Sequence, residues 1–299
     1  MISVCIPVYN YDISILVRDI HDQASKTGVN FEIVLIDDDS RIFYKEKNRE
    51  LARLEGVVYE ELEKNVGRSR IRNLLAAKAR FPYLIFMDCD SQCPDQHYVK
   101  RYLDAAHGDM VVCGGRSYLS ESPEDDTYLH WLYGTHREVR SCKERMKRPN
   151  HHFMTNNFMI SSSLFAGFAF NENLQGYGHE DTLLGYELLQ NNIEIQHIEN
   201  PLIHVGLDSA EAFLKKTAQG TKNLLIISEF PGCRGNLAEM IKLLRTYLCI
   251  RKWGLAGIIA TLFSVSKKKL EKNLTGRSPK LIYLDLYKLG SICQNASRG

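Results

Sequence analysis

Short apolar runs alternate with amphipathic stretches through the first half of the chain. The runs are nearly continuous in Val, Ile and Leu, which is typical of parallel strands covered on both faces. Between residues 68 and 80, Ile71, Leu74 and Leu75 recur at helical spacing. This alternation predicts an α/β fold with a mostly parallel, twisted sheet flanked by helices. The predicted strands are 2–8, 31–36, 57–60, 84–87 and 110–115, and the predicted helices lie near 13–24, 68–80 and 95–107.

The pattern changes in the second half. Between 120 and 176 we predict loops around one helix at 127–140. A helix over 208–229 follows, with Asp208 and Glu211 in the spacing of a capping box. Since 299 residues allow about two domains, we predict an α/β domain over 1–207 and a helical C-terminal extension over 208–299. The helices predicted in the tail are 236–250, 254–272 and 279–292.

Charge is distributed unevenly along the chain. The formal charge of the whole chain is +2, but from Cys233 onward 13 Lys and Arg stand against 3 Asp and Glu. The tail therefore carries +10 and the 232 residues before it carry −8. An acidic body with a basic tail indicates an anionic surface as a partner.

The tail combines its positive charge with apolar side chains such as Trp253 and Phe263. Segments of this kind can lie in an anionic membrane surface. The alternative is a helical cap packed on the sheet, with solvated lysines. We expect no nucleic-acid partner, because the acidic body would repel phosphates and RNA-binding motifs are missing.

Location is predicted from what the sequence does not contain. The N-terminus has no basic region followed by an apolar one, so no signal peptide is expected. No run reaches the ~18 apolar residues of a membrane span. The eight Cys form no CxxC pair, which favours reduced thiols over a zinc or redox site. We therefore expect a cytoplasmic protein, peripheral on the inner face of the membrane.

Polar clusters follow three of the predicted strands, at 7–10, 37–40 and 88–91. One cluster alone would indicate a solvated turn. Three at neighbouring strand ends favour a ligand site, because open α/β sheets bind ligands beyond the carboxyl ends of their strands. In the third cluster Asp88 and Asp90 lie one residue apart, and two such close anions are favourable mainly around a cation or a donor cluster.

Five short motifs follow one another along the chain: PVYN (7–10), DDDS (37–40), NVGRSRIRN (65–73), DCD (88–90) and GYGHED (176–181). Together they resemble the inverting, metal-dependent glycosyltransferases of family 2, which have the GT-A fold. The resemblance covers about residues 1 to 210. Two departures concern Asp39, where the family usually has Gly or Asn, and Glu187, where many members have Arg.

The resemblance implies a metal site with Mn²⁺ or Mg²⁺ as cofactor. Asp90 would be the direct ligand, and Asp88 would contact the ribose or reach the metal through water. His204 falls where several members place a further ligand, and an imidazole favours Mn²⁺. The alternative for His204 is a core histidine with a satisfied hydrogen bond. Carboxylate and phosphate oxygens suit such hard cations.

The resemblance also implies how the donor nucleotide is bound. Asp38 would accept the uracil N3–H, and Pro7 and Tyr9 would form the pocket wall. Arg68 and Arg72 lie four residues apart on one predicted helical face. Arg72 matches the position that braces the first Asp of the metal motif or the diphosphate. A solvated basic helix face is the alternative.

The last motif would supply the general base. Asp181 matches the family base, and Glu180 would bind acceptor hydroxyls. The alternative is that both cap a helix, where the macrodipole favours acidic residues. The stretch at 148–153 reads as a mobile loop over the donor, and its His151 and His152 stay open as extra metal ligands.

We therefore expect an inverting hexosyl- or N-acetylhexosaminyltransferase of polysaccharide biosynthesis. It would use a UDP-sugar donor and a glycan or lipid-linked saccharide as acceptor. One alternative is a sugar-nucleotide-binding protein without transferase activity, for which Glu187 is the hint. Another is a nucleotidyltransferase on a similar fold. That class normally shows a Gly-rich loop after the first strand, which this chain lacks.

Overall fold

The computed structural model describes residues 1–233 and 236–297. The chain divides into two compact units, each described here by itself. The α/β unit comprises Met1–Leu119, Val139–Gln175 and Glu180–Gly206. The helical unit comprises Ser120–Glu138, Gly176–His179 and Leu207–Gly299. The domain division at 207 and 208 stays a prediction, and the helical unit also takes in two earlier segments.

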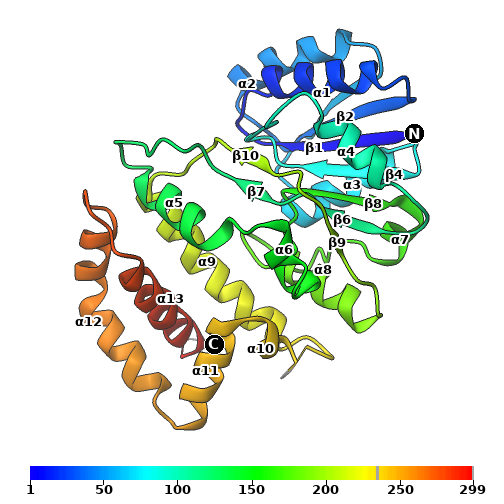
Figure 1. Ribbon diagram of the computed structural model, residues 1–299. Helices are drawn as coiled ribbons and strands as arrows, with labels where there is room; N and C mark the ends of the chain where they lie inside the picture. Colours follow the sequence, from blue (N-terminus) through cyan, green and yellow to red (C-terminus); the bar gives the residue numbers. More distant parts are fainter. Residues whose placement is uncertain (234–235, 298–299) are drawn as a thin grey trace. The chain divides into compact units, whose positions relative to one another are not determined.

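The α/β unit is built on a seven-stranded sheet in the order β3-β2-β1-β4-β8-β6-β9 (Figure 1). Strands β3, β2, β1 and β4 are parallel, and β8 runs antiparallel to both β4 and β6. The predicted α/β fold with a mostly parallel sheet is confirmed. The strands are β1 Ile2–Val8, β2 Phe31–Asp37, β3 Val57–Glu61, β4 Tyr83–Met87, β6 Val111–Cys113, β8 Asn157–Ser161 and β9 Gln196–His197.

A second, three-stranded sheet joins distant parts of the same unit. Its order is β5-β10-β7, with β5 Ser91–Gln92, β7 Arg116–Ser117 and β10 Leu202–His204. In it His204 pairs with Ser91, directly after the DCD motif. These strands are too short to show a period of two, which is why the sequence did not predict them.

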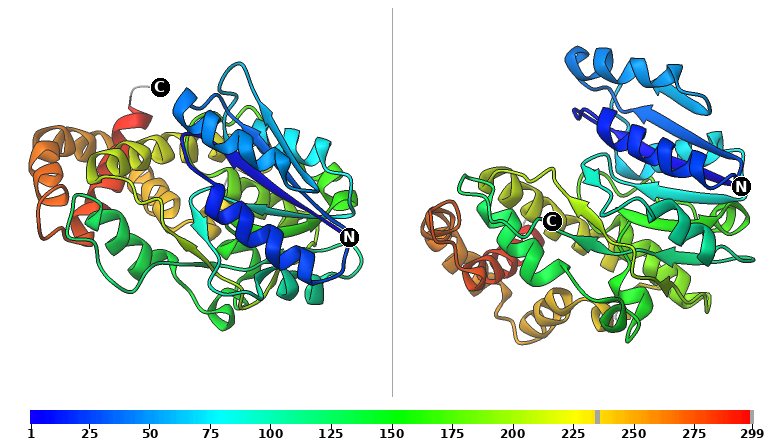
Figure 2. Two further views of the ribbon diagram at one scale, coloured as in Figure 1. Left: turned by 90° about the horizontal axis from the view of Figure 1, so that it is seen from above. Right: turned by 45° about the horizontal axis from the view of Figure 1, so that its top comes forward.

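Helices cover both faces of the large sheet (Figure 2). The apolar stripes of α1 and α4 contribute to one buried cluster, and those of α3 and α8 contribute to the other. The helices and helical turns of the unit are α1 Ser14–Lys26, α2 Ile42–Arg49, η1 Glu50–Arg53, α3 Arg68–Lys78, α4 Tyr98–Ala105, α6 Cys142–Arg145, η3 Pro149–His152, α7 Ser162–Gly167 and α8 Glu180–Gln190.

The helical unit has its own apolar core, which includes Phe213, Phe263 and Tyr287. In it α12 and α13 lie side by side, with the Phe263 and Tyr287 rings edge to face at 5.4 Å (Figure 1). The helices are α5 Tyr128–Tyr133, with a π turn at Gly134–Glu138, α9 Ala210–Ser228, α10 Leu237–Met240, α11 Lys242–Lys252, α12 Ala256–Leu274 and α13 Leu281–Ala296.

Three predictions about these helices were wrong in detail. The helix predicted over 127–140 is α-helical only to Tyr133. The predicted helix over 236–250 breaks at Ile241 into α10 and α11. Helix α9 is capped by Ser209, whose hydroxyl accepts from the Ala212 N–H, while Asp208 pairs with Lys216 at 2.7 Å. Asp208 therefore lies one residue before the cap, where its carboxylate is paired with a lysine of α9.

Within the described residues, no helix taken singly has the length and composition to cross a membrane. Helices α11 and α12, joined at a bend of 116°, meet those criteria only as a pair.

Candidate active site

The loops after β1 and β2 are tied together where the two strands end side by side. The Asn10 N–H donates to the Ser40 hydroxyl at 2.7 Å, and the Asn10 side chain accepts from the Arg41 N–H at 2.9 Å. Asp39 has φ of +65°, in the left-handed region. This backbone explains why Gly or Asn is usual at that position, and Asp also tolerates it.

Asp38 fixes the segment that leads into α3. Its two carboxylate oxygens accept from the N–H groups of Val66 at 2.6 Å and Gly67 at 3.1 Å. Burial raises the pKa of Asp38, and these two hydrogen bonds offset part of the rise. Pro7 is partly buried in β1 and Tyr9 is exposed beyond it. The uracil contact of Asp38 and the wall formed by Pro7 and Tyr9 stay predictions.

Asp88 lies among three guanidinium groups. Arg72, with only 1% of its surface exposed, donates to Asp88 Oδ1 at 2.6 Å. Arg68 and Arg116 lie 3.8 and 3.9 Å from Asp88 Oδ2. The negative charge of Asp88 is therefore largely balanced by protein cations, and its role toward ribose or metal stays a prediction.

Asp90 has a different environment, although it is two residues away. Its Oδ1 lies 3.4 Å from His204 Nδ1, and within the described residues this buried oxygen accepts no hydrogen bond. Burial would raise the pKa of Asp90, but the contact with His204 and the charges of Arg116 and Arg68 lower it to about 2. Asp90 is thus an anion with an oxygen available to a cation.

Gly206 allows this arrangement. A Cβ at that position would lie 2.4 Å from the Cβ of Asp90, so only glycine leaves room for the carboxylate. The ring of Tyr118 packs edge to face against His204, with centroids 5.6 Å apart. Among the residues that the structure describes, no three His, Cys, Asp or Glu side chains are grouped to hold a metal. Asp90 and His204 are nevertheless brought together, and their oxygen and nitrogen donors suit Mn²⁺.

Glu180 and Asp181 begin α8. Glu180 is buried and accepts a hydrogen bond from Arg68 Nε. Burial would raise the pKa of Glu180, but the charges of Arg68 and Arg72 outweigh burial and lower it. Asp181 contacts Thr182, and burial together with the charge of Glu180 raises the pKa of Asp181 to about 6. Glu180 is therefore held as an anion by its arginine neighbours, whereas Asp181 is more basic than an ordinary carboxylate.

Sequence reasoning missed Arg116, Tyr118 and Gly206. A signal for Arg116 existed, because it follows the strand predicted at 110–115 and so belongs to the same edge as the acidic clusters. Tyr118 and Gly206 gave no signal, since each depends on the short strands of the second sheet. Glu187 lies on α8, where burial raises its pKa.

The stretch at 148–153, for which we predict a mobile loop over the donor, contains a short helical turn. This turn is η3, and the buried Asn150 donates to the carbonyl oxygens of Gly185 and Ile193. Burial lowers the pKa of His152 to about 4. These anchors attach the turn to α8 and the segment after it.

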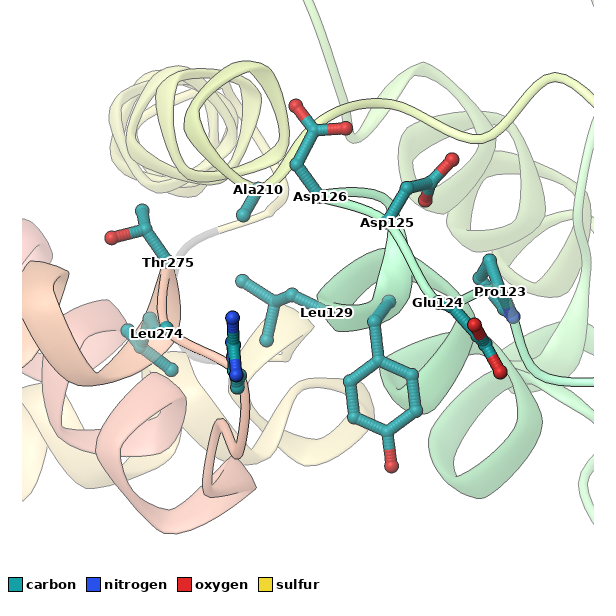
Figure 3. Close-up of a pocket in the computed structure, with 11 residues that line it drawn as sticks. Pro123, Glu124, Asp125, Asp126, Leu129, Ala210, Leu274 and Thr275 are labelled. Carbon is teal, nitrogen blue, oxygen red and sulfur yellow. The ribbon is translucent and has the colours of Figure 1, made fainter.

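A cavity of about 520 Å³ lies in the helical unit and contains none of the predicted site residues (Figure 3). Its lining combines apolar side chains with three consecutive acidic residues. The lining residues drawn in Figure 3 include Glu124, Asp125, Asp126, Leu129, Ala210 and Leu274. We assign no role to this cavity.

The chain matches a protein-family model and is similar in sequence to a known protein. The model described as "Glycosyl transferase family 2" matches residues 3–168, which is more than half of the chain. The chondroitin synthase of Escherichia coli is 25% identical over an alignment of 240 residues, which covers 68% of this chain. This chain spans only 34% of the length of that relative.

One solved structure shows a similar fold, and a second is less similar. The mannosyltransferase of Pyrobaculum calidifontis, solved with GDP-Man and Mn²⁺, is 12% identical, with a TM-score of 0.60 over 99% of this chain and 86% of that one. S. aureus TarS 1–349, solved with UDP-GlcNAc, is 17% identical, with a TM-score of 0.49 over 99% and 91% of the two chains.

Proposed function

Because the chain belongs to glycosyl transferase family 2, whose members are nucleotide-sugar-dependent transferases, we propose a specific reaction for it. A hexose or N-acetylhexosamine moves from a UDP-sugar to a hydroxyl group of a glycan or lipid-linked saccharide, with inversion at the anomeric carbon. The similarity to a chondroitin synthase supports a glycan acceptor. The cytoplasmic location stays a prediction.

The observation that carries the proposal is the environment of Asp90. A buried, ionised carboxylate with an oxygen that accepts no hydrogen bond among the described residues lies beside His204. Asp90 and His204 would hold Mn²⁺ or Mg²⁺, with Asp88 nearby. When bound, the cation would neutralise charge on the leaving diphosphate. Asp90 follows the carboxyl end of β4, beside the carboxyl ends of β1 and β2, and open α/β sheets bind ligands beyond these ends.

Asp181 is the proposed base. With a pKa near 6 it is mostly ionised at neutral pH, yet it is more basic than an ordinary carboxylate. It takes the proton of the acceptor hydroxyl as the new bond from that oxygen to the anomeric carbon forms. The bond from the anomeric carbon to the diphosphate oxygen breaks, and UDP leaves with the electron pair.

The contacts of Glu180 favour a role other than the acceptor contact that the resemblance implies. Its carboxylate is buried against Arg68, which also lies 3.8 Å from Asp88. We propose that Glu180 positions Arg68 rather than binding an acceptor hydroxyl. A preference for uridine rests on Asp38, whose oxygens retain lone pairs beyond those used by Val66 and Gly67.

The test is calorimetric titration of UDP, with and without Mn²⁺, into the wild type, Asp90→Asn and Asp39→Asn. We expect wild-type binding to need Mn²⁺ and to weaken by about tenfold or more in Asp90→Asn. Asp39→Asn is the matched control, because Asn tolerates its left-handed backbone and Asp39 is exposed on the same loops. UDP binding that is the same with and without Mn²⁺, and the same in Asp90→Asn, would overturn the metal assignment.

A transfer assay separates the enzyme from a non-catalytic binding protein. Release of UDP from UDP-sugars, measured with candidate saccharide acceptors, should depend on Asp181. Donor binding without any release, in every donor and acceptor combination, would favour the binding protein.

A further inference from the structure

Helix α12 has two apolar faces, whereas a helix on the surface of a globular unit needs only one. Its inner face contributes Phe263 and Leu274 to the core of the helical unit. There the Phe263 ring lies against Gly290 of α13, where a Cβ would come within 2.3 Å of the ring. This inner face accounts for the packing of the helix.

The outer face is apolar and exposed. Leu262 and Val265 are 63% and 83% exposed, and Trp253, just before the helix, is 75% exposed. At about 100° per residue, Leu255, Ile258, Leu262 and Val265 fall within an arc of roughly 80°. That arc is nearly opposite the inner face. We call these four residues, together with Trp253, the outer stripe.

Positive charge lies at both ends of the outer stripe. Arg251 and Lys252 precede it, and Lys268, Lys269 and Lys272 follow it. Lys269 falls in the same arc as the stripe. The single acidic residue of α12, Glu271, lies on the other side and is 3.8 Å from Lys267. Within the described residues, none of the five flanking cations has a carboxylate partner.

We propose that the outer stripe of α12 docks on an anionic lipid bilayer, with the helix lying in the interface. The stripe from Leu255 to Val265 is roughly 15 Å long at 1.5 Å per residue. That length is about half of the ~30 Å hydrocarbon core, so it suits a helix that lies in the surface and does not cross. The cations at its two ends would meet anionic headgroups, each adding roughly fivefold to the affinity.

The same charges argue against a second copy of this chain as the occupant. An isologous contact through the outer stripe would bring the flanking cations of two copies together. Such like charges repel in an interface without acidic partners. A bilayer with anionic headgroups supplies both the apolar layer and the opposite charge.

Vesicle flotation tests the proposal on the full chain. Phosphatidylcholine vesicles are compared with vesicles containing about 30% phosphatidylglycerol, at low and high salt. We expect the wild type to float with the anionic vesicles and to be released by salt. Leu262→Ser with Val265→Ser should weaken binding by more than about tenfold, because the contact loses two apolar side chains that the bilayer would bury.

The matched control is Ile15→Ser with Ile42→Ser, which removes two exposed apolar side chains, 84% and 59% exposed, from the α/β unit. This control should float like the wild type. Lys268→Gln with Lys269→Gln and Lys272→Gln should lose the preference for anionic vesicles. Asp90→Asn should float normally, so failure of docking and failure of the proposed chemistry are distinguishable.

Trp253 provides a second readout, because the chain has only two Trp. In a Trp131→Phe variant, the remaining Trp fluorescence should shift to the blue on anionic vesicles and be quenched by brominated lipids. Absence of flotation and of the shift would overturn the proposal. The proposal would also fail if the Leu262→Ser, Val265→Ser variant bound vesicles as well as the wild type does. It would fail too if the wild type dimerised with rising concentration and this variant did not.

Discussion

The α/β unit contains two pairs of neighbouring carboxylates that are alike in one member and differ in the pKa of the other. Asp88 and Asp90 follow β4, and Glu180 and Asp181 begin α8. In each pair one member is held by an arginine, Asp88 by Arg72 and Glu180 by Arg68. The other member differs between the pairs, because the pKa of Asp90 is lowered and that of Asp181 is raised.

The difference is explained by the neighbours. Asp90 lies beside His204 and within the field of two arginines, which outweigh the effect of burial. The charge of Arg68 also lowers the pKa of Asp181, but burial and the charge of Glu180 outweigh it. A carboxylate whose cationic neighbours outweigh its burial stays ionised, whereas one whose burial outweighs them holds its proton more tightly. This difference supports the two roles that we propose for Asp90 and Asp181.

The largest expected effect is on the base. Asp181→Asn should lower kcat for transfer by about 10²–10⁴-fold, since general-base catalysis contributes about that much. Binding of UDP with Mn²⁺ should change little. Initial rates of UDP release, together with calorimetry, check both statements.

The effect of Glu180→Gln on the transfer rate is compared with that of Asp181→Asn. The transfer rate of Glu180→Gln should fall less than that of Asp181→Asn, because Glu180 acts through Arg68. A greater loss in Glu180→Gln, measured well below the unfolding temperature of both variants, would reverse the roles of the two residues.

The next effect is on stability. Arg72→Met would leave Asp88 without its closest cation and should lower the free energy of unfolding by about 3 kcal/mol. Denaturant unfolding measures this change. Asp88→Asn in the same chain should recover part of the loss, and a strictly additive double variant would show that the two side chains are not coupled.

The sequence predicts the first carboxylate pair better than its surroundings. Asp88 and Asp90 follow a buried apolar run, and the parallel sheet necessarily brings that strand end beside the ends of β1 and β2. The motif alone could not show that Arg116 and Gly206 complete the site. Both depend on two- and three-residue strands that have no readable period.

The second pair was harder to interpret. Its place at a helix start was expected, yet Glu180 lies against Arg68, 112 residues away in sequence. No local pattern encodes a contact of that separation, so the resemblance alone assigned Glu180 to the acceptor. The cap of α9 was misassigned for a related reason, because Asp208 is engaged by Lys216 on the next turns.

A smaller effect concerns pH. With Asp181 as the proposed base, transfer requires its ionised form, so kcat/KM should fall about tenfold per pH unit below pH 6. Glu180, whose pKa is lowered, stays ionised through that range and should not contribute. A rate profile from pH 4.5 to 8, with folding monitored in parallel, tests this. A flat profile down to pH 5 would contradict a base with the raised pKa.

The smallest expected effect is on stability. Asp181→Asn, which should lower the transfer rate, should raise the free energy of unfolding. The folded state raises the pKa of Asp181 from 3.8 to about 6, so it binds the proton more tightly than the unfolded chain. Ionisation therefore costs stability as pH rises from about 4 to 6, and the full cost is present above pH 6. Asp181→Asn removes that cost, and its side-chain oxygen can still accept from the Thr182 N–H.

At pH 7.5 we expect Asp181→Asn to be more stable than the wild type by about 1 kcal/mol. A shift of this size corresponds to about 3 kcal/mol for a fully buried group, but Asp181 is partly exposed and solvent screens it. The advantage should vanish below pH 4, where the wild-type carboxyl is protonated in both states. Unfolding curves at pH 7.5 and 4 measure it, and a destabilised variant at pH 7.5 would mean that Asp181 is an N-terminal anion stabilised by the α8 dipole.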